Sequence, residues 1–289
     1  METKPSISII GRGAVGSALV DFFRQSDYSL RSVWGHRKEE SFLMSDDEEI
    51  QAEHTFPQSS SDLGEIIFIA VPDDKIAEVA DQLSNQKIDW SLHSVVHLSG
   101  AKSSDLLSSI KEKGGATASM HPLQTFTKGD GSDRFKDIYI SLEGDEELVE
   151  KLEGIVSDFG ALSFKLTPDQ KRSMHIAAVF ASNYLVSLMD IVHQITSKNG
   201  IENGLQILAP IIRQTFSNIE EKGIEQSLSG PVKRGDLNTI KQHLSDLDDA
   251  PELTKNLYKK LGLQALNITQ KSGQLTPEQV KELKDLLDL

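Results

Sequence analysis

The sequence predicts an α/β fold in which a doubly wound, mainly parallel sheet is followed by an all-helical C-terminal domain. Over the first 166 residues, short β-rich apolar runs alternate with helical stretches, which is typical of a parallel sheet covered on both faces. From Thr167 onward the sequence offers no convincing strand, and helical stretches follow capping signals such as Thr167-Pro168. We therefore expect a sheet domain over residues 1–166 and a helical domain over residues 167–289.

Bulk composition excludes several classes of protein. The chain has 289 residues, of which 38% are hydrophobic, and no cysteine, so disulfides, thiolate metal sites and a cysteine nucleophile are excluded. The formal net charge of −14 argues against a nucleic-acid or anionic-membrane partner. No run of about 18 apolar residues and no apolar N-terminal signal segment is apparent. We therefore expect no membrane span and a cytoplasmic protein.

The first strand and helix flank a glycine-rich turn. Residues 5–10 are predicted as a strand and residues 14–23 as a helix, with Gly11, Gly13 and Gly16 between and within them in GxGxxG spacing. The first glycine allows a tight turn, the second a close approach of a pyrophosphate, and the third close packing of helix on strand. A glycine turn without a ligand is the alternative. The residues predicted to hold a dinucleotide here are Gly11, Arg12, Gly13, Ala14, Val15 and Gly16.

The end of the second predicted strand, residues 30–34, favours NADP over NAD. An acidic residue at this position binds the ribose hydroxyls of NAD, whereas this chain has Gly35 followed by His36, Arg37 and Lys38. Cationic side chains attract a 2′-phosphate, and Arg12 in the glycine loop can add to the charge. The alternatives are a solvated loop start and a site for NAD.

Further strands are predicted where apolar runs end in polar or small residues. They cover residues 52–56, 66–71, 94–98, 116–120, 137–142 and 162–166, with helices to Leu83 and over about 104–113 and 146–159. Ligands of doubly wound sheets lie at the carboxyl ends of the strands. We therefore expect the cofactor to contact Ala70, Val71, Pro72, Ser99 and Gly100.

The helical domain is expected to open with one long helix over residues 169–198. On it, Lys171, His175 and Ser182 lie within about 40° of one another at roughly 100° per residue. A Lys or His at the edge of an apolar face could supply a proton as hydride arrives. The alternatives are a solvated lysine and a packed structural histidine. Further helices are predicted over residues 201–222, 237–247 and 251–270 and from residue 277.

Other candidate residues follow the strand at residues 116–120. His121, held by Pro122, is predicted at the carboxyl edge of the sheet, with Gln124 in the same loop as a substrate ligand. Arg234, in the segment GPVKRGD, could pair with a substrate carboxylate. His93 and His97 would be ~13 Å apart on one strand, too far for one metal ion, and we predict no catalytic metal.

These motifs together resemble one family over the whole chain. GRGAVG at 11–16, AVPD at 70–73, HLSGA at 97–101, MHPLQTF at 120–126 and GPVKRGD at 230–236 are similar to those of Rossmann-like oxidoreductases with a helical C-terminal domain of unknown function. That group is related to pyrroline-5-carboxylate reductase, prephenate dehydrogenase, ketopantoate reductase and the 3-hydroxyisobutyrate and 6-phosphogluconate dehydrogenases.

The resemblance implies NADP, a cleft between the domains and a homodimer built by the helical domain. It also implies that Lys171 matches a catalytic lysine of the hydroxyacid dehydrogenases, although His175 replaces their asparagine, and that Ser99 lies in a substrate-binding loop. We expect hydride transfer to or from a small carbonyl, hydroxy acid or imine, with Lys171, His175 or His121 handling the proton. A non-catalytic NADP-binding sensor is the alternative.

Overall fold

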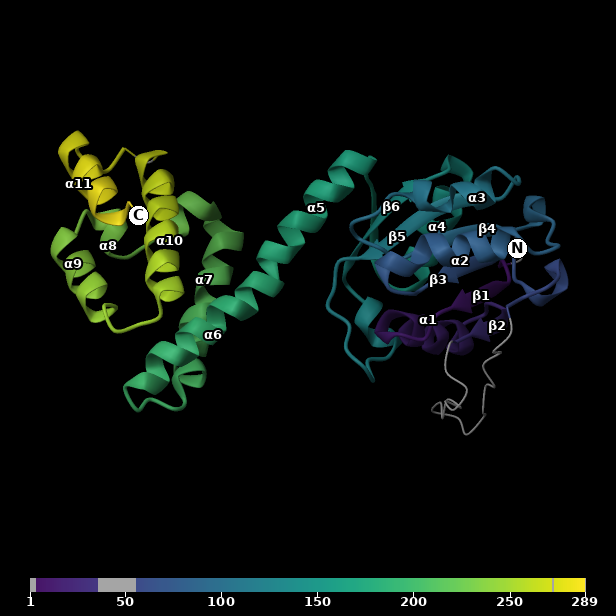
Figure 1. The fold of residues 1–289 in the computed structure, drawn as a ribbon, viewed down its shortest axis with the longest axis horizontal. Helices are drawn as coiled ribbons and strands as arrows, with labels where there is room; N and C mark the ends of the chain where they lie inside the picture. The colour runs from purple at the N-terminus through teal and green to yellow at the C-terminus, as the bar shows by residue number, and fades with distance from the viewer. Residues whose placement is uncertain (1–3, 36–55, 272, 289) are drawn as a thin grey trace. The chain divides into compact units, whose positions relative to one another are not determined.

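The computed structural model describes residues 4–35, 56–271 and 273–288 (Figure 1). The chain divides into two compact units, Met1–Ser182 and Asn183–Leu289, which are described separately below. The domain boundary predicted at residue 166 differs from this division mainly in the helix that follows Thr167, and it stays a prediction.

The first unit is built on a seven-stranded sheet of order β2-β1-β3-β4-β5-β6-β7. The strands are β1 (Ile7–Ile10), β2 (Leu30–Trp34), β3 (Ile66–Ile69), β4 (Ser94–His97), β5 (Ala116–Pro122), β6 (Tyr139–Gly144) and β7 (Leu162–Lys165). Strands β1 to β5 are parallel, whereas β6 is antiparallel to β5, and β7 is parallel to β6. The predicted mainly parallel sheet is confirmed. The reversal at β6 needs no crossover helix, because an antiparallel strand starts at the edge where its neighbour ends. The short strand predicted over residues 52–56 lies almost wholly outside the described residues.

Helices cover both faces of this sheet and form two apolar clusters. On one face, α1 (Ala14–Gln25) and α4 (Glu146–Asp158) pack around Phe23 and Phe68. On the other face, α2 (Ile76–Ser84) and α3 (Ser108–Lys111) pack around Ile69. Alternate residues of each strand enter alternate clusters, as the two-residue period of a strand requires.

The second face of the sheet changes from apolar to polar along one row of paired residues. Ile10 pairs with Ile69, and Ile69 with His97; the row continues through Ser119 to Glu143. We call His97, Ser119 and Glu143 the polar row. All three are buried, and a buried polar group costs free energy unless it is hydrogen-bonded. This half of the face therefore needs a polar element to cover it.

That element is α5 (Pro168–Ala181), the last helix of the first unit. Thr167 caps it, accepting from the Gln170 N–H while the Gln170 side chain accepts from the Thr167 N–H. The expected single helix over residues 169–198 is wrong, because it breaks at Ser182, which has φ −121° and ψ −73°. Ser182 and the following asparagine have lower helix propensity than the Ala and Leu around them. Ser182 therefore does not share a continuous helix with the residues beyond it.

The second unit is helical throughout its described residues. It contains α6 (Asn183–Lys198), α7 (Gly204–Ser227), α8 (Pro231–Arg234), α9 (Leu237–Asp246), α10 (Glu252–Lys271) and α11 (Pro277–Leu287). Its core comprises Ile240, Leu244, Leu266, Leu283 and Leu287. Asp236 caps α9 by accepting from the Thr239 N–H at 3.1 Å.

One apolar segment departs from the expectation that the chain has no membrane-length stretch. Among the described residues, Pro168–Lys198 is long and apolar enough, by length and composition only, to cross a membrane, and its most apolar window has none of its residues buried. The break at Ser182 divides it into helices of 14 and 16 residues, each shorter than the roughly 20 residues that a spanning helix needs.

Candidate functional site

The glycine turn between β1 and α1 is built for the close approach of a ligand. Gly11 has a φ of +105°, and a Cβ added there would lie 2.3 Å from the Ala70 carbonyl oxygen. A Cβ on Gly16 would lie 2.3 Å from the Gly11 carbonyl oxygen. Gly13 is the N-cap of α1 and has no side chain to cap it. The first N–H groups of α1 thus stay available to an anion, which the helix dipole also favours.

A pocket of about 700 Å³ opens beside this turn. Six residues predicted to bind the cofactor line it, namely Gly11, Arg12, Gly13, Ala70, Val71 and Pro72. Sequence reasoning missed its other walls, which are Trp34, Gly35, Phe56, Pro57, Lys75, Glu78, Val79 and Gln82. Position could have found most of them. Trp34 and Gly35 lie at the carboxyl end of β2, and Lys75, Glu78, Val79 and Gln82 follow that of β3, where ligands of such sheets bind.

The side chain of Arg12 extends from the glycine turn to Gly35, directly after β2, where the ribose of a dinucleotide is expected. A Cβ on Gly35 would lie 2.5 Å from Arg12 Cδ, so the arginine side chain crosses the backbone of Gly35 in space that only glycine leaves open. His36, Arg37 and Lys38, also predicted to bind NADP, lie outside the described residues. Ala14, Val15 and Gly16 lie in the first turn of α1.

The lysine on α5 is buried in the sheet face rather than solvated. Lys171 is only 2% exposed, and its ammonium donates a hydrogen bond to Ser119 Oγ. Ser119 Oγ in turn donates to the Ser99 carbonyl oxygen at 3.3 Å. The alternative of a solvated first-turn lysine is therefore wrong. Lys171 supplies the polar cover that the polar row requires.

Burial strongly affects the ionisation of this ammonium. Loss of solvent lowers the pKa of Lys171 to about 8, against the opposing effect of the Glu143 and Asp73 carboxylates, which raise it. A group whose pKa lies near the pH of the cell can both give and take a proton. Lys171 thus has the ionisation expected of a general acid.

Ser99 organises the loop after β4. Its hydroxyl donates to Asp73 Oδ2 at 2.7 Å and accepts from the backbone N–H groups of Ala101 and Lys102 at 3.2 and 3.1 Å. Asp73 follows Pro72 directly, so this bond ties the loop to the wall of the cofactor pocket. The predicted site residue Ser99 therefore links this loop to Asp73, which the sequence singled out only as part of the motif AVPD at 70–73.

The two histidines at the ends of β4 and β5 are neutral at physiological pH. His97 Nε2 lies 2.9 Å from the Ser103 carbonyl oxygen and its Nδ1 accepts from the Ser99 N–H at 3.2 Å, which assigns the Nε2–H tautomer. Burial, with the nearby Lys171 charge, lowers the pKa of both His97 and His121 to about 4. Neither ring is in the imidazolium form near pH 7.

His121 and His175 come together from β5 and α5. Their ring centroids are 6.2 Å apart in an edge-on arrangement. Gly100 makes room for the pair, since a Cβ there would lie 2.5 Å from His121 Cε1. The structure thus gathers Ser99, Gly100, His121, Lys171 and His175 at one edge of the sheet.

The two predicted substrate ligands have partners close by in the sequence. Gln124 is exposed, and its side chain accepts from the Thr125 N–H at 2.8 Å. Arg234 belongs to the second unit and lies 3.9 Å from Asp236. Over the described residues, no group of three or more His, Asp or Glu side chains is arranged to hold a metal ion.

Comparison with known proteins identifies the two halves of the chain. Residues 1–122 match the profile of a Rossmann-like domain, and residues 138–265 match a domain of unknown function (DUF2520). A search of curated proteins found no match.

Solved structures show the same fold at low sequence identity. A protein of Bacteroides fragilis, provisionally named an NADP oxidoreductase, is 21% identical with a TM-score of 0.72, covering 91% of this chain and 98% of its own. A protein of Thermotoga maritima is 23% identical with a TM-score of 0.65, covering 92% and 99%. An imine reductase of Myxococcus stipitatus in complex with NADP⁺ is 15% identical with a TM-score of 0.59, covering 96% and 99%.

Proposed function

We propose that this chain, which joins a Rossmann-like domain to a DUF2520 domain, is an NADP-dependent oxidoreductase that transfers hydride to or from a small carbonyl, hydroxy acid or imine. The observation that carries the proposal is the buried Lys171 ammonium at the edge of the sheet where the cofactor pocket opens. The similar solved structures that are named as NADP oxidoreductases and imine reductases support the reaction class. They leave the substrate open.

The residues present fit a dinucleotide. Gly11, Gly13 and the N-terminus of α1 would hold the diphosphate, and the apolar Val71 and Val79 would face the rest of the nucleotide in the pocket. Arg12 would meet the 2′-phosphate that distinguishes NADP from NAD. When bound, the cofactor supplies or accepts the hydride.

The chain's own groups would handle the proton. The Lys171 ammonium has three N–H donors, and the bond to Ser119 uses one of them. Another can be given to a substrate oxygen or nitrogen that gains electrons. His121 and Gly100 would bound the space in which the substrate lies, with His121 neutral and able to accept or donate one hydrogen bond.

Cofactor binding tests the proposal through a matched pair of glycine variants. A Cβ on Gly13 has the Ala70 carbonyl oxygen at 4.0 Å as its nearest contact, and a Cβ on Gly154 of α4 has nothing within 4 Å. Both Gly13→Ala and Gly154→Ala should therefore fold. Only Gly13→Ala adds bulk where the diphosphate approaches. Overpacking costs about 1–3 kcal/mol, so we expect NADPH binding to weaken roughly 5- to 150-fold in G13A and to stay unchanged in G154A.

Titration calorimetry measures the affinities of the wild type, G13A and G154A for NADPH and NADH. Equal weakening by both variants, or no NADPH binding by the wild type, would contradict the cofactor site. Tighter binding of NADH than NADPH would remove the roles given to Arg12 and Arg37. Binding of NADPH without turnover across a panel of small carbonyls and imines would favour the non-catalytic sensor.

We also propose a cytoplasmic homodimer formed through the helical elements. Large apolar side chains on α6 and α7 of the second unit are exposed, namely Val186 (70%), Ile207 (65%) and Ile211 (62%). Exposed apolar surface of this kind marks interaction sites. A second copy of the chain would cover it.

The dimer is expected to be lost when a charge is placed on this surface. Val186→Glu should shift the sedimentation coefficient from that of a dimer to that of a monomer. Leu92→Glu, at an equally exposed apolar residue (61%) outside this surface, should leave it unchanged. A wild-type protein that sediments as a monomer, or that requires detergent, would argue against the dimer.

A further inference from the structure

We infer that Glu143 is a positioning residue for Lys171, and that its clamped carboxylate keeps the lysine charged and oriented over Ser119. The expected effect of Glu143 on turnover rests on the proposed function. The coupling between Glu143 and Lys171 does not.

Strand register places the two charges together. Ser119 on β5 and Glu143 on β6 are direct partners in an antiparallel pair. Side chains of such partners leave the same face with their Cβ atoms about 4.5–5.5 Å apart. The Lys171 ammonium bonds to Ser119 Oγ on that face. The carboxylate of Glu143 is thus the cross-strand neighbour of the ammonium's hydrogen-bond partner.

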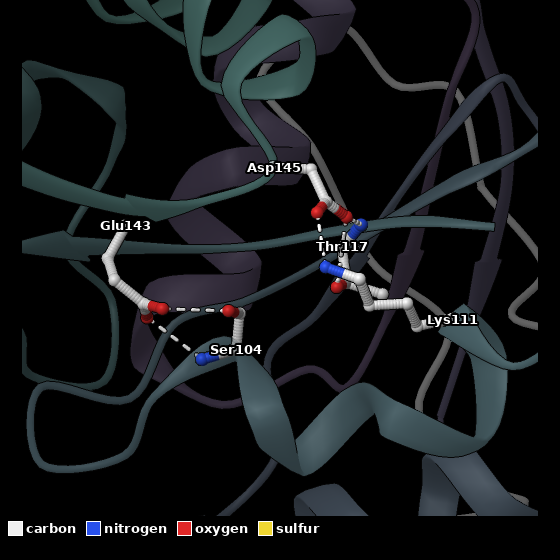
Figure 2. A network of polar contacts seen from close by, with 5 residues as sticks. All are labelled: Ser104, Lys111, Thr117, Glu143 and Asp145. Atoms are coloured by element: carbon white, nitrogen blue, oxygen red, sulfur yellow. Dashed lines mark hydrogen bonds and ion pairs between the residues drawn. The ribbon is translucent and has the colours of Figure 1, made fainter. Parts of the chain in front are cut away.

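The Glu143 carboxylate is held in place from the opposite side. Its Oε2 accepts from the Ser104 N–H at 2.8 Å and its Oε1 accepts from Ser104 Oγ at 2.7 Å (Figure 2). Glu143 is only 9% exposed. Its carboxylate, on the strand next to that of Ser119, is therefore held by Ser104, and Ser119 is the hydrogen-bond partner of the buried ammonium.

A second carboxylate, on Asp145 directly after β6, makes different contacts. Asp145 accepts from the Thr117 N–H at 2.7 Å and pairs with the exposed Lys111, and Figure 2 shows this group separate from the Glu143–Ser104 bonds. The buried Lys171 is not among the charges that act on Asp145. Asp145 is therefore a matched control for Glu143.

The charged and titratable groups that act with Lys171 come from several elements. They are Glu143 on β6, Asp73 at the end of β3, His97 on β4 and His121 on β5, with His175 one turn further along α5 itself. His97 and His121 are neutral because their pKa values are lowered to about 4, and Asp73 is already bonded to Ser99. Glu143 comes first among the groups that raise the pKa of Lys171.

Direct titration of Lys171 tests the inference. NMR of the full chain labelled at lysine side chains, with the Lys171 signal assigned by its loss in Lys171→Met, gives the ionisation midpoint. Glu143→Gln removes the charge yet can still accept from the Ser104 N–H and donate to its hydroxyl. We expect its Lys171 midpoint to fall by about one pH unit or more, Asp145→Asn to leave it unchanged, and Glu143→Asp to keep it closer to the wild type than E143Q does.

Unfolding in urea provides a second, independent readout. If the charges are coupled, the E143Q/K171M double variant should be more stable than the summed changes in unfolding free energy of the two single variants predict. If E143Q alone fails to fold while the double variant folds, that outcome also shows that the two charges are coupled. An unmoved Lys171 midpoint in E143Q, or additive changes in unfolding free energy, would overturn the inference. A midpoint that moves while the pH–rate profile stays fixed would instead contradict the catalytic role proposed for Lys171.

Discussion

Replacing Lys171 by methionine is expected to lower the turnover of the NADPH-dependent reaction by about 10²–10⁴-fold, the usual contribution of a positioned general acid. Methionine retains most of the buried volume but has no proton to give. Binding of NADPH should be unchanged, because Lys171 bonds to Ser119 and does not line the cofactor pocket. The measurement is kcat with the best substrate found in a carbonyl and imine panel.

The matched control is a lysine outside this cluster. Lys111 pairs with Asp145 on the surface, so Lys111→Met should retain wild-type turnover. In the wild type, turnover in the reductive direction should fall as pH rises through about 8, because the Lys171 ammonium is lost there. Full activity in K171M, or the same pH limb in that variant, would remove Lys171 from the mechanism.

The buried charge of Lys171 is also expected to make stability depend on pH. Its pKa is lowered in the folded chain from 10.5 to about 8, so between these values the unfolded state binds more protons and stability rises with pH. Below about pH 8 the folded state carries the full cost of a buried ammonium, about 3 kcal/mol at 1.36 kcal/mol per pKa unit. Above 10.5 both states are neutral and the cost vanishes.

Comparison with Lys171→Met isolates this effect from other titrating groups. The difference in unfolding free energy between wild type and K171M, measured in urea from pH 7 upward, should shift toward the wild type as pH rises past about 8. Most of the ~3 kcal/mol should appear by pH 10. Parallel curves for the two proteins would show that Lys171 is not buried as an ion.

Together these two expectations describe a residue kept for function at a cost in stability. A buried ammonium is favourable only with good partners, and here Ser119, Glu143 and Asp73 provide them incompletely, since the pKa of Lys171 stays lowered. Methionine would relieve this cost. A stability cost of this kind is typical of functional sites.

Local sequence determined the fold class and the cofactor turn. The alternation of apolar runs with helical stretches, and the spacing of Gly11, Gly13 and Gly16, are short-range patterns that do not depend on distant contacts. The capping signal at Thr167 was equally local, and the cap forms. The break at Ser182 was missed, because Ala- and Leu-rich neighbours outweigh one serine in a propensity argument.

The tertiary structure alone decided whether Lys171 is solvated or buried. Its sequence position allowed a solvated lysine as readily as a buried one, because the partners that bury it lie on β5 and β6, far away in the chain. Only the pairing of β5 with β6 places Glu143 opposite Ser119, and only the packing of α5 brings the ammonium to them. Charge states depend on solvent exclusion and on neighbours within a few ångströms, and these are properties of the folded chain. The sequence by itself thus determined where a dinucleotide would bind, while the tertiary structure determined which group beside it can hold a proton.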